Sequence, residues 1–177
     1  MARLRSFSED LTSGIDSINE SNVLSKLILI EETFEYFFFN HSICFFDLET
    51  TGINVAKDRI VEIAVLKVFP NGNKESKTWL VNPEMPIPKE VIAVHGITDE
   101  KVANEPNFKT LAPQVYALIK DADLGGFNSD RFDIPLLAEE MLRAGIDFDM
   151  NDRKAIDVQV IFHKKEQRTL SAGYKFY

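Results

Sequence analysis

The chain has 177 residues, a formal net charge of −8 and 45% hydrophobic residues, enough to form the core of one ordinary globular domain. The acidic balance argues against a free-standing, high-affinity nucleic-acid binder, because phosphate contacts need Lys and Arg. It leaves room for a nuclease whose carboxylates bind metal. Cys44 is the only cysteine, and no stretch is apolar enough to span a bilayer. We therefore expect a cytoplasmic protein without membrane contacts.

Residues 1–40 differ in pattern from the rest of the chain. They begin with a polar stretch and end with apolar residues at irregular helical spacing. We expect an N-terminal extension that is helical or partly disordered. Its apolar part could pack on the following domain or on a second subunit, which would make the protein a homo-oligomer. Residues 41–177 form the predicted domain.

Three strands are predicted first. The apolar run Ile43-Cys44-Phe45-Phe46 predicts a buried strand over 43–48, in which Cys44 is a core residue. Residues 59–69 are rich in β-branched side chains and predict a second strand. A Pro-Asn-Gly-Asn turn separates it from a third strand over 75–81. These short connections predict antiparallel neighbours.

Helices and further strands follow. Pro88 suits the first turn of a short helix, and Thr98 suits a helix N-cap. An amphipathic pattern predicts a helix over 108–120, followed by a strand over 122–127. The remaining predictions are a helix over 131–144 with Ile134, Leu137, Met141 and Leu142 inward, a strand end at 155–158 and a helix beginning at Val160. The order β-β-β-α-α-β-α-β-α predicts an α/β fold with a mixed sheet flanked by helices.

Two carboxylates stand at the end of the first predicted strand. Strand side chains alternate between faces, so Asp47 and Glu49 project from the same face. Carboxylates that close repel each other unless a cation or a proton lies between them. The small-residue turn Thr50-Thr51-Gly52 follows. The pattern indicates a divalent-metal site that is open to a substrate.

A second acidic segment, Asn128-Ser129-Asp130-Arg131-Phe132-Asp133, follows Gly125-Gly126. Asp133 lies in the first turn of the predicted helix, where a carboxylate also suits the helix dipole. From its residue type and position alone, Asp133 could equally be a metal ligand or an acid that only stabilises the start of the helix. Phe127 and Phe132 are expected in the core.

These motifs resemble those of a known family. Phe46-Asp47-Leu48-Glu49-Thr50-Thr51-Gly52 resembles the first motif of the DEDD superfamily of 3′–5′ exonucleases, and Asn128–Asp133 resembles the second. Between them, Val94-His95-Gly96-Ile97-Thr98 resembles the loop that holds the terminal nucleotide in the proofreading branch, typified by the epsilon subunit of bacterial DNA polymerase III. The resemblance runs from Ile43 to the C-terminus.

The resemblance implies a ribonuclease-H-like fold and phosphodiester hydrolysis with two Mg²⁺ or Mn²⁺ ions. By this resemblance Asp47 bridges both ions, Glu49 holds the ion that carries the attacking water, and Asp133 completes the cluster. The implied substrate is a single-stranded DNA or RNA 3′ end, and a DNA polymerase subunit is the implied protein partner. The implied substrate-binding residues are Leu48, Thr50, Thr51, Gly52, His95, Gly96 and Asn128.

The family's third motif, a His or Tyr followed by Asp, has no match before Tyr177. We expect that the chain stops short of this motif. Asp157 could replace the missing acid, although the family position is more often structural. The main expectation is a metal-dependent 3′–5′ exonuclease of the DNA-proofreading type. The alternatives are an exoribonuclease, or a non-catalytic module that binds nucleic acid or a polymerase through an incomplete site.

Overall fold

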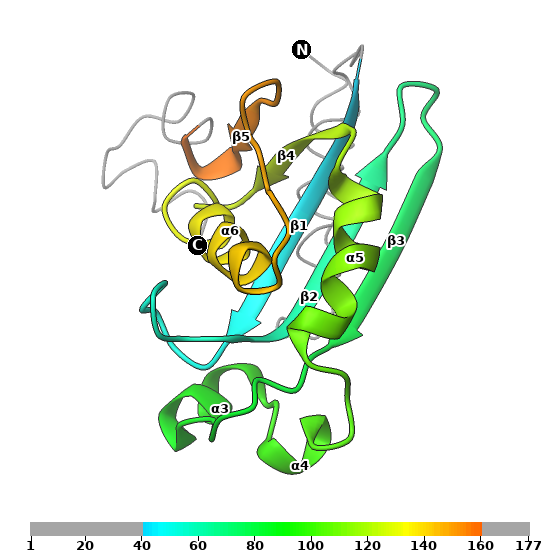
Figure 1. The fold of residues 1–177 in the computed structure, drawn as a ribbon. Helices are drawn as coiled ribbons and strands as arrows, with labels where there is room; N and C mark the ends of the chain where they lie inside the picture. Colours follow the sequence, from blue (N-terminus) through cyan, green and yellow to red (C-terminus); the bar gives the residue numbers. More distant parts are fainter. Residues whose placement is uncertain (1–40, 161–177) are drawn as a thin grey trace, which may run out of the picture.

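A computed structural model describes residues 41–160, which form a five-stranded sheet with helices packed against it (Figure 1). The strand order is β3-β2-β1-β4-β5. The first three strands pair antiparallel, whereas β4 pairs parallel with β1 and β5 pairs parallel with β4. This topology confirms the predicted mixed sheet. The strands are β1 (Ser42–Thr50), β2 (Ile60–Val68), β3 (Lys74–Leu80), β4 (Ala122–Gly126) and β5 (Ala155–Asp157).

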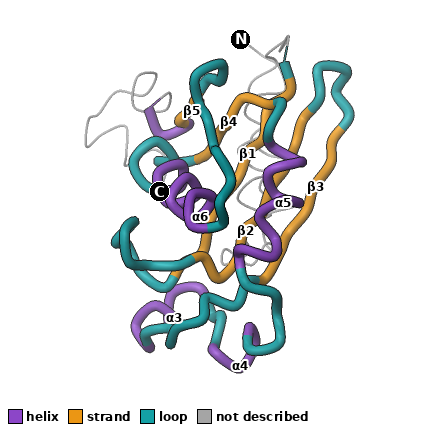
Figure 2. The backbone as a smooth tube through the Cα atoms, in the orientation of Figure 1, coloured by secondary structure: helices purple, strands orange, loops and turns teal. Residues whose placement is uncertain are grey.

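Four helices accompany the described strands: α3 (Lys89–His95), α4 (Asp99–Val102), α5 (Phe108–Ile119) and α6 (Asp133–Arg143). Helices α5 and α6 lie over one face of the sheet, and α3 and α4 lie at the end where β1 terminates (Figure 2). The predicted order counted two helices between β3 and β4, whereas the structure has three, which begin near the helix starts expected at Pro88, Thr98 and residue 108. The proline-rich loop after β3 and the Thr98 cap each start a separate short helix, since the Thr98 side chain accepts from the Lys101 N–H.

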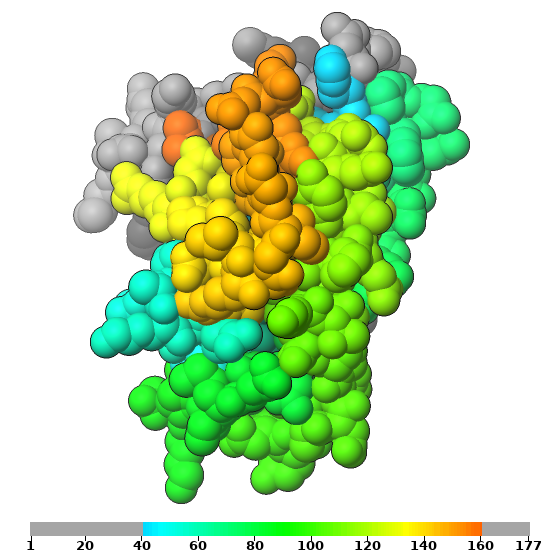
Figure 3. Space-filling model, viewed as in Figure 1, coloured from blue at the N-terminus to red at the C-terminus, as the bar shows by residue number. Residues whose placement is uncertain are grey.

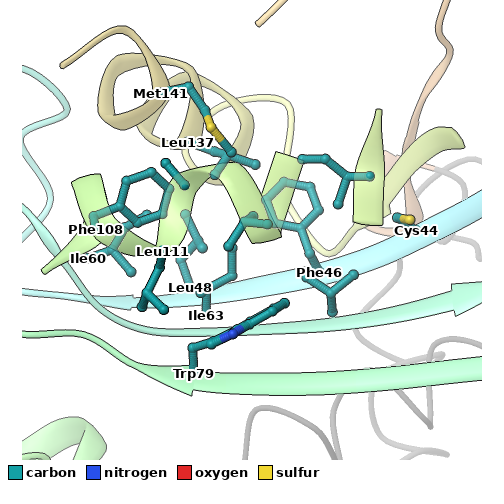
Figure 4. Close-up of a cluster of buried hydrophobic side chains, with 14 of the residues drawn as sticks. Cys44, Phe46, Leu48, Ile60, Ile63, Trp79, Phe108, Leu111, Leu137 and Met141 are labelled. Carbon is teal, nitrogen blue, oxygen red and sulfur yellow. The ribbon is translucent and has the colours of Figure 1, made fainter. Parts of the chain in front are cut away.

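The main core lies between the sheet and helices α5 and α6. Alternate residues of β1, including Phe46 and Leu48, meet Leu111 of α5 and Leu137 of α6 (Figure 4). Cys44 belongs to this core and has no exposed surface. Burial raises the pKa of its thiol to about 12, which confirms the prediction that it is a packing residue. The intervening β1 residues, such as Phe45, pack on the opposite face of the sheet.

Two of the predicted core residues are exposed. Leu142 is 70% exposed, because the buried stripe of α6 runs through Leu136, Leu137 and Met141 and leaves the following position turned outward. Phe127 is 52% exposed, because the chain leaves the sheet after Gly126. Phe132 is half-buried against the main core, as expected.

Some sequence predictions lie outside the described residues. They concern the extension over residues 1–40, the continuation of the last helix beyond residue 160, and the segment up to Tyr177 in which the third motif was sought. That helix begins at Val158, two residues before its predicted start. Within residues 41–160, no helix combines the length and hydropathy needed to cross a membrane.

The two faces of α6 yield a stability prediction. We expect Leu137→Ala to lower the free energy of unfolding by roughly 2–5 kcal/mol, because it empties a fully buried position. We expect Leu142→Ala, on the exposed face, to change it by less than about 0.5 kcal/mol. Urea unfolding of both variants measures the difference. Equal losses would mean that α6 is rotated from the orientation described.

Candidate active site

Strand β1 places Asp47 and Glu49 on the same face of the sheet. Phe46 and Leu48 point into the core beneath α5 and α6, so the two intervening carboxylates point the other way. Both side chains are half-buried. Glu49 pairs with Glu62 of β2 across the antiparallel ladder, which adds a third negative charge nearby. The same-face prediction is confirmed.

Helix α6 brings Asp133 to the edge of β1. Strand β4 pairs with β1 only as far as Phe45, opposite Gly125, so the later part of β1 is left open on that side. The first turn of α6 occupies this opening. The buried Asp133 carboxylate accepts a hydrogen bond from the Leu48 backbone N–H. The structure therefore joins the two acidic segments that lie far apart in the sequence.

A close backbone approach makes this junction fit. A Cβ atom at Gly126 would lie 2.8 Å from Ser129 Cβ and 3.0 Å from the Phe46 carbonyl oxygen. Those separations are shorter than side chains tolerate, so only glycine lets the turn before α6 pack this close to β1. Gly126, the second glycine of the pair that precedes the second motif, thus has a defined steric role.

The pKa of the Asp133 carboxyl is raised from its ordinary value to about 7. Burial is the largest cause, and the charge of Asp47 is the next. Glu49 adds a smaller effect, while hydrogen bonds from the Leu48 N–H and from the backbone of Asp133 act in the opposite direction. The charges of Asp47 and Glu49 therefore both act on the Asp133 carboxylate. A divalent cation would relieve this repulsion, and hard carboxylate oxygens suit Mg²⁺ or Mn²⁺.

The acids are close together but do not form a closed metal cage. Within residues 41–160, no group of three or more His, Cys, Asp or Glu side chains is already arranged to hold a metal ion. Asp157, the candidate replacement acid, is engaged elsewhere. Its buried carboxylate accepts from the backbone N–H groups of Asn128 and Gln159, both at 2.9 Å. Asp157 thus holds the backbone in place, which is the structural role that acids at this position of the family more often have.

The segment after β1, residues 51–59, is built around the Asp58 carboxylate. Its Oδ1 accepts from Thr51 Oγ1 at 2.9 Å, and its Oδ2 accepts from the Asn54 N–H at 2.7 Å. A Cβ at Gly52 would lie 2.6 Å from Asp58 Oδ2. Gly52 is therefore required for the carboxylate to sit inside the loop. We call residues 51–59 the β1–β2 loop.

Helix α3 ends beside the β1–β2 loop. His95 is 9% exposed, and its Nδ1 accepts from the Ile97 N–H at 3.0 Å. Its Nε2 must then carry the proton, and it donates to the Thr50 carbonyl oxygen at 3.3 Å. Gly96 follows with φ 73°, a left-handed conformation that ends α3. The structure thus places the segment of residues 94–98 next to the first motif.

Several backbone groups of the predicted substrate site are already paired inside the protein. The Leu48 N–H bonds to Asp133, and the Thr51 N–H donates to the Arg59 carbonyl oxygen at 2.9 Å. Thr50 Oγ1 donates to the Gly52 carbonyl oxygen at 2.7 Å. Asn128 has φ 59°, and its backbone is held by Asp157. These residues therefore shape the site through a fixed backbone.

Sequence reasoning missed the apolar surface around this loop. Ile53 is 89% exposed at the loop and Val94 is 78% exposed on α3. Met85 is 38% exposed, and its sulfur lies 3.8 Å from Thr51 Oγ1. The signal for Ile53 was present, because an isoleucine directly after a Thr-Thr-Gly turn has no strand or helix in which to be buried.

Buried Glu140 was missed as well. It is 1% exposed, and its Oε1 accepts from Arg59 Nε at 2.7 Å and from Arg143 Nη1 at 2.5 Å. Its spacing from Leu136 and Leu137 puts it on the apolar stripe of α6, where an ionised residue needs a partner. That spacing was a readable signal.

Comparison with solved structures identifies the fold of the chain. Escherichia coli exonuclease I in complex with a dT13 oligonucleotide superposes on 73% of this chain and 30% of its own chain, with a TM-score of 0.64 and 20% sequence identity. At that identity the likeness establishes the fold. The chain therefore has the ribonuclease-H-like fold that the motifs implied.

The chain belongs to the exonuclease family, because the family model described as "Exonuclease" (RNase_T) matches residues 44–175. The DNA polymerase III subunit epsilon of Treponema pallidum is 32% identical over 96 residues, which cover 54% of this chain and 44% of that protein. The uncharacterized exonuclease CP81 of Escherichia phage 186 is 30% identical over 138 residues, covering 75% and 69%. The match spans less than half the length of the first curated relatives.

The raised pKa of Asp133 predicts how stability changes with pH in metal-free protein. Its folded-state pKa of about 7 lies above the ordinary value of 3.8, so the folded state holds the proton more tightly. The free energy of unfolding should fall as pH rises from about 4 to about 7. Asp133→Asn should therefore stabilise the protein at pH 8, by on the order of 2–4 kcal/mol, and should have little effect near pH 4.

Urea unfolding at both pH values, in the presence of a chelator, measures this effect. Asp147→Asn is the matched control, because Asp147 is exposed and lies outside the cluster. An Asp133→Asn effect that is the same at pH 4 and pH 8 would contradict the described crowding.

Proposed function

We propose that this chain is the catalytic domain of a 3′–5′ exonuclease that hydrolyses phosphodiester bonds at single-stranded DNA ends. Asp47, Glu49 and Asp133 would bind its divalent cations. One observation carries the proposal. The pKa of Asp133 is raised partly by Asp47 and Glu49, so two segments separated by most of the domain converge on one patch of negative charge. That patch borders a glycine-containing loop and His95.

The residues fit a pair of Mg²⁺ or Mn²⁺ ions, which when bound supply charge neutralisation at the phosphate and an activated water. Asp47 and Glu49 would hold the cations on one face of β1 and Asp133 would hold them from α6. The Leu48 N–H orients the Asp133 carboxylate before any cation arrives. The protein therefore keeps part of the site in position before substrate binds.

The β1–β2 loop and the end of α3 would hold the terminal nucleotide. Their backbone is fixed by the Asp58 carboxylate and by His95, which donates to the Thr50 carbonyl. The exposed Ile53 and Val94 side chains supply apolar surface against which a base can stack without sequence preference. Such a surface accepts the end of an unpaired strand, whatever its sequence.

The choice of single-stranded DNA draws support from the neighbours. The solved structure of Escherichia coli exonuclease I holds a dT13 oligonucleotide, and one relative is named a DNA polymerase III subunit. By extension we propose association with a replicative polymerase. An exoribonuclease would use the same acids and would differ only in contacts to the 2′-hydroxyl.

Substitution of Asp47 tests the proposed chemistry. The complete gene product should shorten a 5′-labelled single strand of DNA stepwise from its 3′ end when Mn²⁺ or Mg²⁺ is present. Asp47→Ala should lower the rate by roughly a thousandfold or more, because the cations contribute several kcal/mol to the transition state. Denaturing gel electrophoresis resolves the products, and the exposed Asp147→Ala serves as the control.

Each other outcome points to a different function. Unimpaired cleavage by Asp47→Ala would disprove the assigned site. Faster cleavage of an RNA strand of the same sequence would establish the exoribonuclease. Tight binding of DNA by the wild-type protein, without cleavage in either metal, would establish a non-catalytic binding module.

Cation dependence gives a separate prediction. Saturating Mn²⁺ should raise the melting temperature of the wild-type protein at pH 8, because it neutralises the three crowded carboxylates. Asp133→Asn should reduce that rise by at least about half, since it removes one of the charges that attract the cation. Differential scanning fluorimetry with and without chelator measures both rises. An equal rise in the two proteins would place the cation elsewhere.

A further inference from the structure

We infer that Glu140 is a positioning residue, which with Arg59 and Arg143 locks the β1–β2 loop against helix α6 and so sets the affinity for the substrate end. We call these three side chains the α6 clamp. The inference rests on the proposed function for its effect on substrate, but its effect on the loop can be measured independently. The α6 clamp is made of residues other than the three acids Asp47, Glu49 and Asp133.

Glu140 is the centre of the α6 clamp. Its carboxylate is 1% exposed, and Oε1 receives Arg59 Nε at 2.7 Å and Arg143 Nη1 at 2.5 Å. The two arginine side chains are each 25% exposed. Without the carboxylate between them, two cations would face each other in a partly dehydrated site. Glu140 therefore holds both arginines where neither would stay alone.

Arg143 carries the contact from α6 to the loop. Its Nη2 donates to the Ala56 carbonyl oxygen at 2.7 Å, and its Nη1 donates to the Asp58 carbonyl oxygen at 3.1 Å. A planar guanidinium can serve Glu140 and two carbonyls at once, whereas a lysine ammonium has no comparable fork. The loop backbone is thereby tied to the second half of α6.

Arg59 closes the other end of the loop. Its backbone N–H donates to Thr51 Oγ1 at 3.0 Å, and its carbonyl oxygen accepts from the Thr51 N–H at 2.9 Å. Its side chain meanwhile reaches Glu140 on α6. Through Arg59, the Glu140 carboxylate therefore holds both the first and the last residue of the loop.

The α6 clamp and the metal-binding acid share one rigid helix. Asp133 begins α6, and Glu140 follows two turns later, about 10 Å along the axis. In the space-filling view the β1–β2 loop, in cyan and teal, lies against α6 on one side and against α3 on the other (Figure 3). Helix α6 thus fixes the loop that would hold the terminal nucleotide relative to the acid that would hold the cation.

A pre-formed loop affects binding more than chemistry. If the α6 clamp is released, the loop populates other conformations, and the apparent substrate affinity is multiplied by the fraction of molecules that remains competent to bind. Bound substrate can reorder the loop, so the rate at saturation changes less. The signature of a positioning role is thus a raised KM with nearly unchanged kcat. A general loss of folded protein would instead lower kcat and leave KM alone.

Hydrogen exchange of the substrate-free protein tests the loop directly. Glu140→Gln should speed exchange of the Thr51, Asn54 and Arg59 amides by about tenfold or more, because it removes the negative charge that holds both arginines. Amides in the β1–β2 ladder should keep their protection. Glu139→Gln is the matched control, since Glu139 contacts Arg143 on the same helix but is 35% exposed and has no described contact with the loop. Unchanged exchange at the three amides in Glu140→Gln would overturn the inference.

Arg143→Lys is a second variant, which tests the inference even if the Glu140 variant does not fold. It keeps the positive charge beside Glu140 but loses the fork to the loop carbonyls, so it should also speed exchange at Asn54. In the complete gene product, both clamp variants should raise KM for a single-stranded DNA end by about tenfold, with kcat within about twofold. Unchanged KM alongside normal wild-type cleavage would overturn the inference. Absence of wild-type cleavage would instead refute the proposed function, and the exchange result would still decide on the α6 clamp.

Discussion

The seating of helix α6 against the open edge of strand β1 is the contact on which the candidate site depends. It exists because β4 stops pairing with β1 at Phe45 and the chain turns at Gly126, where no side chain would fit. The first turn of α6 then enters the gap, and Asp133 accepts from the Leu48 N–H. A longer β4 would pair with this edge and exclude the carboxylate. Ending one strand early thus creates a position for an acid.

That arrangement carries a cost that also explains its use. A buried carboxylate beside two others is unfavourable, and the raised pKa of Asp133 expresses this. Sites that bind divalent cations are built from such repulsion, which the cation removes. The same helix then returns to the β1–β2 loop through Glu140 and Arg143. The metal-binding end and the substrate-binding loop are thereby held by one element.

Local patterns were sufficient for part of this account. The two-residue period of a strand placed Asp47 and Glu49 on one face, and the structure agrees. The approach of Asp133 was expected only through the family resemblance, because no local signal states where a helix start will dock. Leu142 was misplaced because an apolar residue was assumed to be buried. The spacing of Glu140 indicated a buried acid, but its partner Arg59 lies 81 residues away in the chain, so periodicity could not identify that partner.

The central claim is that Asp47, Glu49 and Asp133 form one cation-binding cluster beside the loop that would receive the strand end. A crystal of the complete protein, soaked in Mn²⁺ with a short DNA strand, tests it by anomalous diffraction. The account predicts manganese peaks at coordination distance, about 2.0–2.3 Å, from oxygens of Asp47 and Glu49, with the strand's 3′ end against the β1–β2 loop. A well-ordered strand whose 3′ end lies elsewhere, or manganese bound away from these acids, would contradict it.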